Sequence, residues 1–113
     1  GYGYWAVRER ETGRYVGDVG LADFHREMTP SLDGAPEAGW VLATWSHGRG
    51  FATEAVRAAL SWADANLDAR RHVCIIDPPN TASLQVAAKC GFRERGCGIY
   101  KDGELIICER VRM

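Results

Sequence analysis

The 113-residue sequence lacks the features that mark a membrane segment, a metal centre or a nucleic-acid binder. No apolar run approaches the ~20 residues that a bilayer-spanning helix needs. Its four cysteines form no C-x-x-C pair, and its three histidines supply no zinc-ligand spacing. The formal net charge is only −1, so nothing in the charge balance favours nucleic acid or an anionic membrane as the main partner. We therefore expect a metal-free domain that binds neither nucleic acid nor membrane.

The missing cysteine pairs also bear on the compartment. Cys74 and Cys108 lie in apolar, strand-like runs, where a free thiol behaves as a small hydrophobic side chain. Structural thiols in a reducing cytoplasm explain this usage better than disulfides do. The hydrophobic content of 46% and the charged content of 26% predict one globular domain over residues 1–113.

The most informative stretch that is present runs from His47 to Ala52 (HGRGFA), between an apolar run and a helical pattern. A strand that ends in a glycine-rich turn and opens a helix presents free backbone N–H groups and a partial positive charge, and this geometry binds phosphate. Arg49 adds a guanidinium that can contact a phosphate through two N–H groups. The alternative is a tight turn that holds no ligand, because two glycines are common at such a junction.

Two common nucleotide-binding loops do not fit these residues. A Walker loop needs Lys-Ser or Lys-Thr after its last glycine, where this sequence has Phe51 and Ala52. A Rossmann turn needs a third glycine at the position of Thr53.

Periodicity along the chain predicts a mixed sheet covered by two helices. Apolar residues at helical spacing predict one helix over 51–67, and Asn80 as N-cap opens a second helix that runs to about Lys89. A bend or bulge is expected at Gly17 and Gly20, and 25–36 has the composition of a polar loop. The strands are expected at 4–9, 15–24, 37–43, 72–76, 92–100 and 104–111.

Two blocks of the sequence resemble the GNAT superfamily of N-acetyltransferases. The stretch from His47 to Ala52 is similar to its acyl-CoA pyrophosphate loop, although the family usually has Gln or Arg where this chain has His47. The segment from Cys74 to Ser83, continuing to Phe92, resembles the RimJ/RimL-type branch, which acetylates protein N-termini and other amines. The resemblance covers nearly the whole chain. It implies an α/β (α+β) fold with a mixed, mostly antiparallel sheet and helices packed on its faces.

The resemblance also implies a reaction and a cofactor site. The reaction is direct transfer of an acetyl group from acetyl-CoA to a primary amine, either a protein N-terminus or a small amine, without a metal. The pantetheine arm would run along a strand backbone, the pyrophosphate would lie on the glycine loop, and Asn80 would contact the arm as well as cap its helix. The predicted cofactor-binding residues are Val41, Leu42, Ala43, His47, Gly48, Arg49, Gly50, Phe51, Ala52, Asn80 and Ser83.

Glu37 is predicted as the general base. It begins the strand that enters the glycine loop, where the resembling family often has an acidic residue. The alternative is a solvated carboxylate at a strand end. Asp18, Asp23 and His25 are further candidates for the same role.

Ser83 is predicted as the proton donor to the leaving sulfur. Many family members carry a tyrosine seven residues after the helix-opening asparagine, and this chain has Ala87 there. The RimJ/RimL-like branch commonly uses the serine three residues after that asparagine, which is Ser83. Its alternative role is capping support in the first helical turn. Tyr100 is an outside candidate.

The chain differs from the resembling enzymes at its start. The resembling enzymes begin with a further strand and two helices that help to wall the acceptor site, and this chain starts at the second strand of that plan, so we expect an N-terminally truncated chain. An open edge strand carrying Tyr4 and Trp5 is compatible with a homodimer.

Two other function classes compete with an enzyme. The second hypothesis is a non-catalytic acyl-CoA-binding module. The third is a structural domain in which 47–52 is only a turn.

Overall fold

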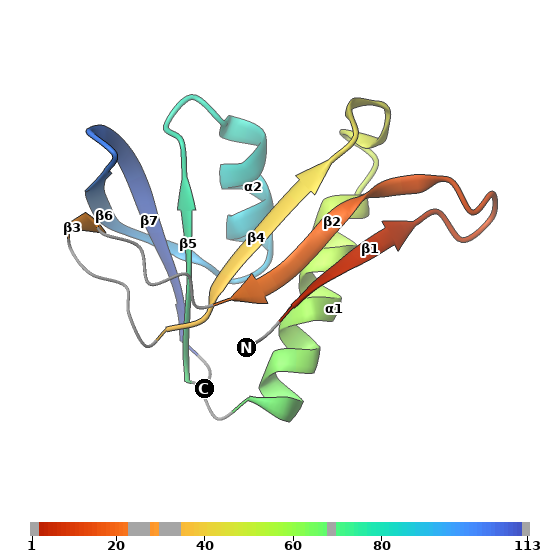
Figure 1. The fold of residues 1–113 in the computed structure, drawn as a ribbon, viewed down its shortest axis with the longest axis horizontal. Helices are drawn as coiled ribbons and strands as arrows, with labels where there is room; N and C mark the ends of the chain where they lie inside the picture. The colour runs from red at the N-terminus through yellow and green to blue at the C-terminus, as the bar shows by residue number, and fades with distance from the viewer. Residues whose placement is uncertain (1–2, 23–27, 30–34, 68–69, 112–113) are drawn as a thin grey trace.

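The computed structural model describes residues 3–22, 28–29, 35–67 and 70–111. From residue 51 on, the chain alternates between helix and strand and then ends in two consecutive strands (Figure 1). The strands are β1 (Tyr4–Arg8), β2 (Tyr15–Ala22), β3 (Met28–Thr29), β4 (Glu37–Leu42), β5 (Arg71–Ile76), β6 (Arg93–Tyr100) and β7 (Gly103–Val111). The helices are the 3-10 turn η1 (Thr44–Ser46), α1 (Phe51–Asn66) and α2 (Thr81–Lys89).

The described strands form one mixed sheet in the order β1-β2-β4-β5-β7-β6-β3. Neighbouring strands are antiparallel except β4 and β5, which are parallel and share a single register position, Glu37 opposite Val73. Beside this position the N–H of Val73 donates to the carbonyl oxygen of Pro36 (3.0 Å). Beyond it the two strands diverge and open the middle of the sheet (Figure 1).

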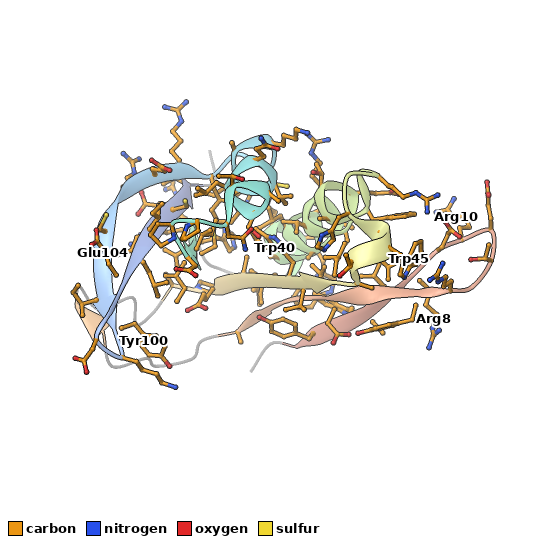
Figure 2. The ribbon with its side chains drawn as sticks, turned by 90° about the horizontal axis from the view of Figure 1, so that it is seen from above. Arg8, Arg10, Trp40, Trp45, Tyr100 and Glu104 are labelled. Atoms are coloured by element: carbon orange, nitrogen blue, oxygen red, sulfur yellow. The ribbon has the colours of Figure 1, made fainter. Side chains whose placement is uncertain are left out.

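Both helices pack on one face of the sheet (Figure 2). In α1 the apolar residues recur every three or four positions, so that one stripe of the helix is buried against the strands. Alternate residues of the strands, such as Cys74 in β5 and Cys108 in β7, complete this core. The helix residues buried in it are Val56, Ala59, Leu60, Ala63 and Ala87.

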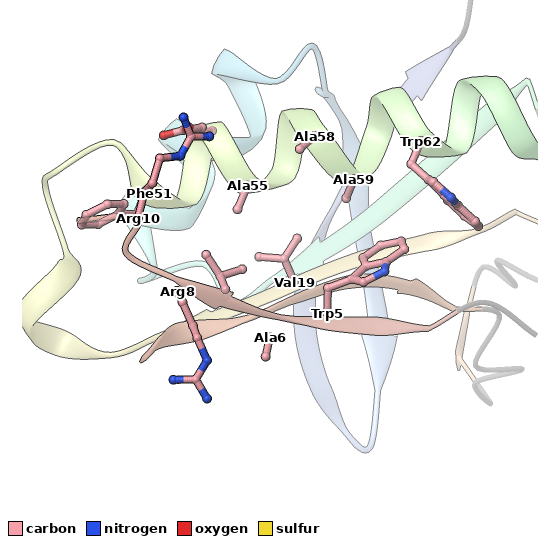
Figure 3. A pocket seen from close by; sticks show the side chains of 12 residues that line it. Trp5, Ala6, Arg8, Arg10, Val19, Phe51, Ala55, Ala58, Ala59 and Trp62 are labelled. Atoms are coloured by element: carbon pink, nitrogen blue, oxygen red, sulfur yellow. The ribbon is translucent and has the colours of Figure 1, made fainter. Parts of the chain in front are cut away.

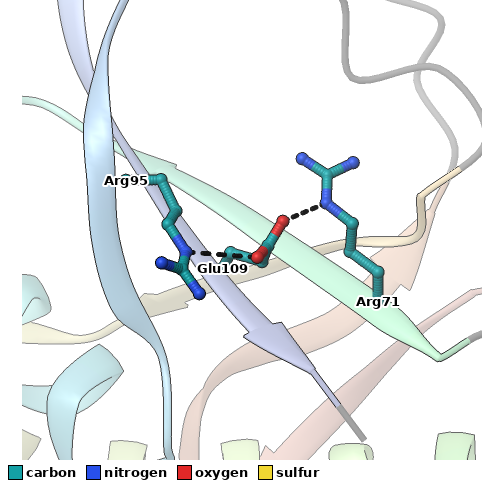
Figure 4. Close-up of polar contacts among 3 residues, drawn as sticks. All are labelled: Arg71, Arg95 and Glu109. Atoms are coloured by element: carbon teal, nitrogen blue, oxygen red, sulfur yellow. Dashed lines mark hydrogen bonds and ion pairs between the residues drawn. The ribbon is translucent and has the colours of Figure 1, made fainter.

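The opposite face of the sheet carries a cluster of charges over its C-terminal strands (Figure 4). Glu109 of β7 accepts hydrogen bonds from Nε of Arg71 in β5 and from Nε of Arg95 in β6 (3.2 Å). The hydrogen bond from Arg71, with the nearby charge of Arg95, holds the pKa of the Glu109 carboxyl below its usual range. Because one carboxylate joins three adjacent strands, the cluster supports their register.

The predicted fold class and order of the main elements are confirmed, and the structure adds to or corrects three local details. The expected loop over 25–36 contains the short strand β3, which pairs with β6. A 3-10 turn separates β4 from the glycine loop, since the hydroxyl and N–H of Ser46 both donate to the carbonyl oxygen of Ala43 (2.7 and 3.0 Å). Of the two glycines where a bend or bulge is expected, Gly17 lies beside a register shift in the pairing of β1 with β2, whereas Gly20 pairs regularly with both β1 and β4.

Candidate functional site

The glycine loop before α1 has an open, left-handed backbone. Gly48 and Gly50 have φ values of +76° and +81°, and a Cβ added at either would meet no atom within 4 Å. Gly50 is the N-cap of α1, and it supplies no side-chain hydrogen bond to the first turn. The N–H groups at the positive end of a 16-residue helix are therefore not capped by a side chain, and they suit an anion.

His47 fastens this loop to the end of β4. Its Nε2 donates to the carbonyl oxygen of Leu42 (3.0 Å), although the ring itself is exposed. This hydrogen bond holds the loop against the end of β4. His47 stands where similar loops carry Gln or Arg, and here its side chain helps to fix the position of the loop.

Arg49 lies within a cluster of aromatic and charged side chains. Its guanidinium is 3.6 Å from the Glu9 carboxylate and lies 5.6 Å and 5.3 Å from the ring centroids of Trp45 and Phe51. Arg14 stacks on the same Trp45 ring, 3.9 Å from its centroid. The sequence did not predict the partners other than Phe51, because Glu9 and Arg14 come from the β1–β2 hairpin and Trp45 comes from η1.

A cavity of about 430 Å³ lies between the glycine loop, both helices and β4, and we call it the loop cavity. Every predicted cofactor-binding residue lines it except Ala43 and Arg49. Ala43 has its backbone engaged within the protein, since its N–H donates to Val16 (2.7 Å) and its carbonyl oxygen accepts from Ser46. Gln85 and Lys89 also line the cavity and were not predicted, although their spacing on α2 from Ala82 matches one helix face.

A second cavity, of about 240 Å³, opens where β4 and β5 diverge, and we call it the strand cavity. Glu37, Tyr4 and Asp77 are among the residues that line it. Trp40, Val41, Asn80 and Ser83 line both this cavity and the loop cavity. The two cavities therefore meet along one shared wall.

Glu37 is buried, with 7% of its surface exposed. It stands at the single position where β4 pairs with β5, so the diverging strands begin at this residue. The alternative of a solvated strand-end carboxylate does not describe its surroundings. The Glu37 carboxylate is thus buried and lines a cavity, and its role as the general base stays a prediction.

Asn80 and Ser83 lie at the start of α2. The Oδ1 atom of Asn80 accepts a hydrogen bond from the backbone N–H of Ser83 (3.2 Å), so the predicted N-cap is confirmed. This cap uses the backbone N–H of Ser83 and not its hydroxyl, and the role of the hydroxyl as proton donor stays a prediction.

Of the remaining candidates for acid or base, the two that lie in the described residues, Asp18 and Tyr100, do not join the site. Asp18 is exposed on β2 and lines neither cavity, and its hydrogen bond with Tyr15 raises the pKa of that phenol. Tyr100 lies at the end of β6 and is also absent from both cavities. Asp23 and His25 lie outside the described residues. No group of three His, Cys, Asp or Glu side chains in the described ranges could hold a metal ion.

A further apolar cavity of about 450 Å³ separates β1 from α1 (Figure 3). Trp5 and Trp62 meet edge to face across it, with ring centroids 5.2 Å apart. Among the predicted site residues it contains only Phe51.

Neither helix of the described chain is long and apolar enough to cross a membrane.

Known proteins are similar to this chain in sequence and in fold. The sequence profile of the family described as "Acetyltransferase (GNAT) domain" matches residues 1–93. The YkkB protein of Bacillus subtilis is 32% identical over 94 residues, which are 81% of this chain and 52% of YkkB. The chain thus spans about half the length of that relative.

Two solved structures show the likeness of the fold. A GnaT-family acetyltransferase from Bordetella pertussis has a TM-score of 0.86 and 30% identity, over 97% of this chain and 66% of that one. The aminoglycoside acetyltransferase AAC(6')-Ib, in complex with coenzyme A, has a TM-score of 0.82 over 98% of this chain and 66% of its own, and at 16% identity it shows the fold alone.

Proposed function

Because this chain belongs to the family of GNAT acetyltransferase domains, we propose that it transfers the acetyl group of acetyl-CoA to a primary amine. The observation that carries the proposal is the shared wall of Trp40, Val41, Asn80 and Ser83, where the two cavities meet. Acetyl-CoA bound in the loop cavity and an amine bound in the strand cavity would approach each other at this wall. Such positioning can supply much of the rate enhancement.

The loop cavity suits the parts of acetyl-CoA in order. The open backbone at Gly48 and Gly50 leaves room for the pyrophosphate at the positive end of α1. Within the described sheet, β4 pairs with β5 only at Glu37, so its backbone can bond the pantetheine amides along Val41 and Leu42 as an added strand would. Asn80 borders the same path.

Glu37 would act on the amine. A protein α-amine has a pKa near ~8, so roughly a tenth of it is neutral at pH 7, whereas a lysine amine near ~10.4 is almost entirely protonated. Only the neutral amine attacks the thioester carbon. A buried carboxylate that lines the strand cavity can take the proton that the nitrogen loses as the C–N bond forms.

Ser83 would act on the departing sulfur. It lines both cavities at the first turn of α2, on the wall where the thioester would lie. Its hydroxyl can donate to the thiolate as the C–S bond breaks, and solvent can restore that proton. The net reaction then converts an amine and acetyl-CoA to an amide and free CoA.

The proposed acceptor is a protein N-terminus or a small amine, as in the RimJ/RimL-like branch. The segment from Cys74 to Phe92 supports this assignment.

The proposed location of the protein is the cytoplasm. The free thiols of Cys74, Cys90, Cys97 and Cys108 are consistent with this reducing compartment.

A non-catalytic acyl-CoA-binding module is the second candidate. The observation in its favour is Ala87, which stands where many family members carry a tyrosine. It would bind acetyl-CoA in the same cavity without turnover.

Thermal unfolding with and without acetyl-CoA, followed by an assay for amine-dependent release of the CoA thiol, tests the proposal. At ~100 times its dissociation constant a ligand adds roughly 2.7 kcal/mol, which raises the midpoint by on the order of 10 °C in a domain of this size. We expect both the shift and amine-dependent release. A shift without release, across a panel of peptide N-termini and small amines, would support the binding module. A folded sample that shows no shift would contradict both.

A further inference from the structure

Tyr4 lies in a trench made by two glycines on neighbouring strands. The pairing of β1, β2 and β4 aligns Tyr4 with Gly20 and Gly20 with Gly39. A Cβ added to Gly20 would lie 2.7 Å from Cγ of Tyr4, and one added to Gly39 would collide with the Tyr4 hydroxyl. The ring therefore extends across β2, and its hydroxyl reaches β4.

The trench is on the face of the sheet away from the helices. Figure 3 shows Trp5 and Val19 pointing toward α1, whereas Ala6 and Arg8 point the other way. Alternation along β1 places Tyr4 with Ala6 and Arg8. This face also belongs to Glu37, because the residue after it, Ala38, packs in the helix-side core.

Gly20 and Gly39 are needed for close packing and not for an unusual backbone conformation. Neither Gly20 nor Gly39 has a positive φ, and β2 pairs with β4 without a bulge through this region. A side chain at Gly39 would displace the Tyr4 hydroxyl, and one at Gly20 would meet the backbone of Gly3 and Tyr4 as well as the Tyr4 ring. Its hydroxyl then stands at the rim of the strand cavity, which Tyr4 lines together with Glu37 and Ser83.

We propose that the Tyr4 hydroxyl accepts a hydrogen bond from the acceptor amine in the strand cavity. The proposal rests on the proposed function. A primary amine has two N–H groups when neutral, so it can donate one to Tyr4 and one to Glu37 while its lone pair faces the thioester. A secondary amine has only one N–H and cannot satisfy both. Tyr4 therefore selects primary over secondary amines.

The test compares a primary amine with its N-methyl analogue as acceptors for the parent chain and for Tyr4→Phe. The phenylalanine ring fills the same trench and loses only the hydroxyl. We expect kcat/KM for the primary amine to fall about tenfold, the size of one hydrogen bond between neutral groups. The value for the N-methyl amine should stay near that of the parent, so the selectivity ratio falls by the same factor. The affinity for acetyl-CoA should not change.

Two further variants sharpen the result. In Gly39→Ala the added methyl group would take the place of the Tyr4 hydroxyl and displace it. The selectivity of this variant for primary over N-methyl amines should therefore fall as that of Tyr4→Phe does. Tyr15→Phe is the matched control, because Tyr15 is as exposed as Tyr4 (44% against 45%) but lines neither cavity. Its kinetics should equal those of the parent.

The outcomes separate this inference from the function on which it rests. If the parent acetylates primary amines and Tyr4→Phe keeps the parent selectivity, the role of Tyr4 is overturned while the proposed function stands. If the parent binds acetyl-CoA but acetylates no amine in the panel, the proposed function fails and the role of Tyr4 fails with it.

Discussion

At Gly48 and Gly50 an added Cβ would point into open space, whereas at Gly20 and Gly39 it would collide with Tyr4. The first pair is needed for its backbone, since both residues have positive φ values. The second pair is needed for its missing side chains, since its backbone is ordinary strand. One pair serves the loop cavity and the other serves the strand cavity.

The two pairs of glycines belong to cavities that are built in different ways. The loop cavity lies between β4, the glycine loop and both helices, and its proposed phosphate site is backbone at the start of α1, so binding there depends on conformation and open space. The strand cavity is formed by side chains from separate strands, so its function depends on which groups reach it. Substitutions in the first should therefore change binding of acetyl-CoA, and those in the second should change turnover.

The largest expected effect would come from Gly50→Glu. The new carboxylate would lie where the pyrophosphate is proposed, and two like charges ~4 Å apart repel by about 4 kcal/mol at an effective dielectric of ~20. We expect the affinity for acetyl-CoA, measured by calorimetry, to fall on the order of 10³-fold. Gly50→Ala is the control for backbone strain, and it should bind far more tightly than Gly50→Glu. Equal affinity of Gly50→Glu and the parent would overturn the phosphate site.

Glu37→Gln should lower turnover while leaving acetyl-CoA affinity intact. A positioned base contributes ~10²-fold or more, so we expect kcat to fall by at least about that factor. The loss should be greater for an amine of pKa ~10.4 than for one of pKa ~8, because the first depends more on proton removal. Steady-state rates with both amines give the comparison. Weakened acetyl-CoA binding instead would assign Glu37 to the cofactor side.

Ser83→Ala tests the shared wall. Loss of one hydroxyl at the leaving sulfur should reduce kcat about tenfold, with little change in acetyl-CoA affinity. Thr81→Ala is the matched control, since Thr81 is in the same helical turn but lines neither cavity. An undiminished rate for Ser83→Ala would remove Ser83 as the proton donor.

The smallest effect is expected at Asn80, where structure and binding can be separated. Asn80→Ala removes the cap of α2 and should cost about 1 kcal/mol of unfolding free energy, or roughly 4–8 °C in midpoint. Asn80→Ser keeps a capping oxygen and should restore most of this stability. If Asn80 also contacts the pantetheine arm, the serine variant should regain stability without regaining full acetyl-CoA affinity.

The loop cavity was largely predictable from the sequence, and the strand cavity was not. His47 to Ala52, the start of α1 and the cap at Asn80 are local, because neighbouring residues determine the backbone there. The alignment of Tyr4 with Gly20 and Gly39 depends on the register of three strands, which no short segment encodes. Glu37 lies between these cases: its position before the loop was informative, and its burial came from the sheet.

The same limit explains the wrong prediction at Gly20. Glycine within a strand pattern suggests a bulge when the partner strands are unknown. Here the residue that needs the space comes from β1, sixteen positions earlier in the numbering. The contacts of Arg49 with Glu9 and Trp45 could not be predicted for the same reason, since these residues belong to other elements.

The single pairing of β4 with β5 has a consequence for the lifetime of the protein. Within the described residues, one backbone position and the packed helices join the β1-β2-β4 part of the sheet to the rest. Regions with few cross-connections open more readily than the whole molecule unfolds, and proteases cut such open states. A bound acyl-CoA arm would bridge the gap, so the degradation rate in a cell would fall as the supply of acetyl-CoA rises.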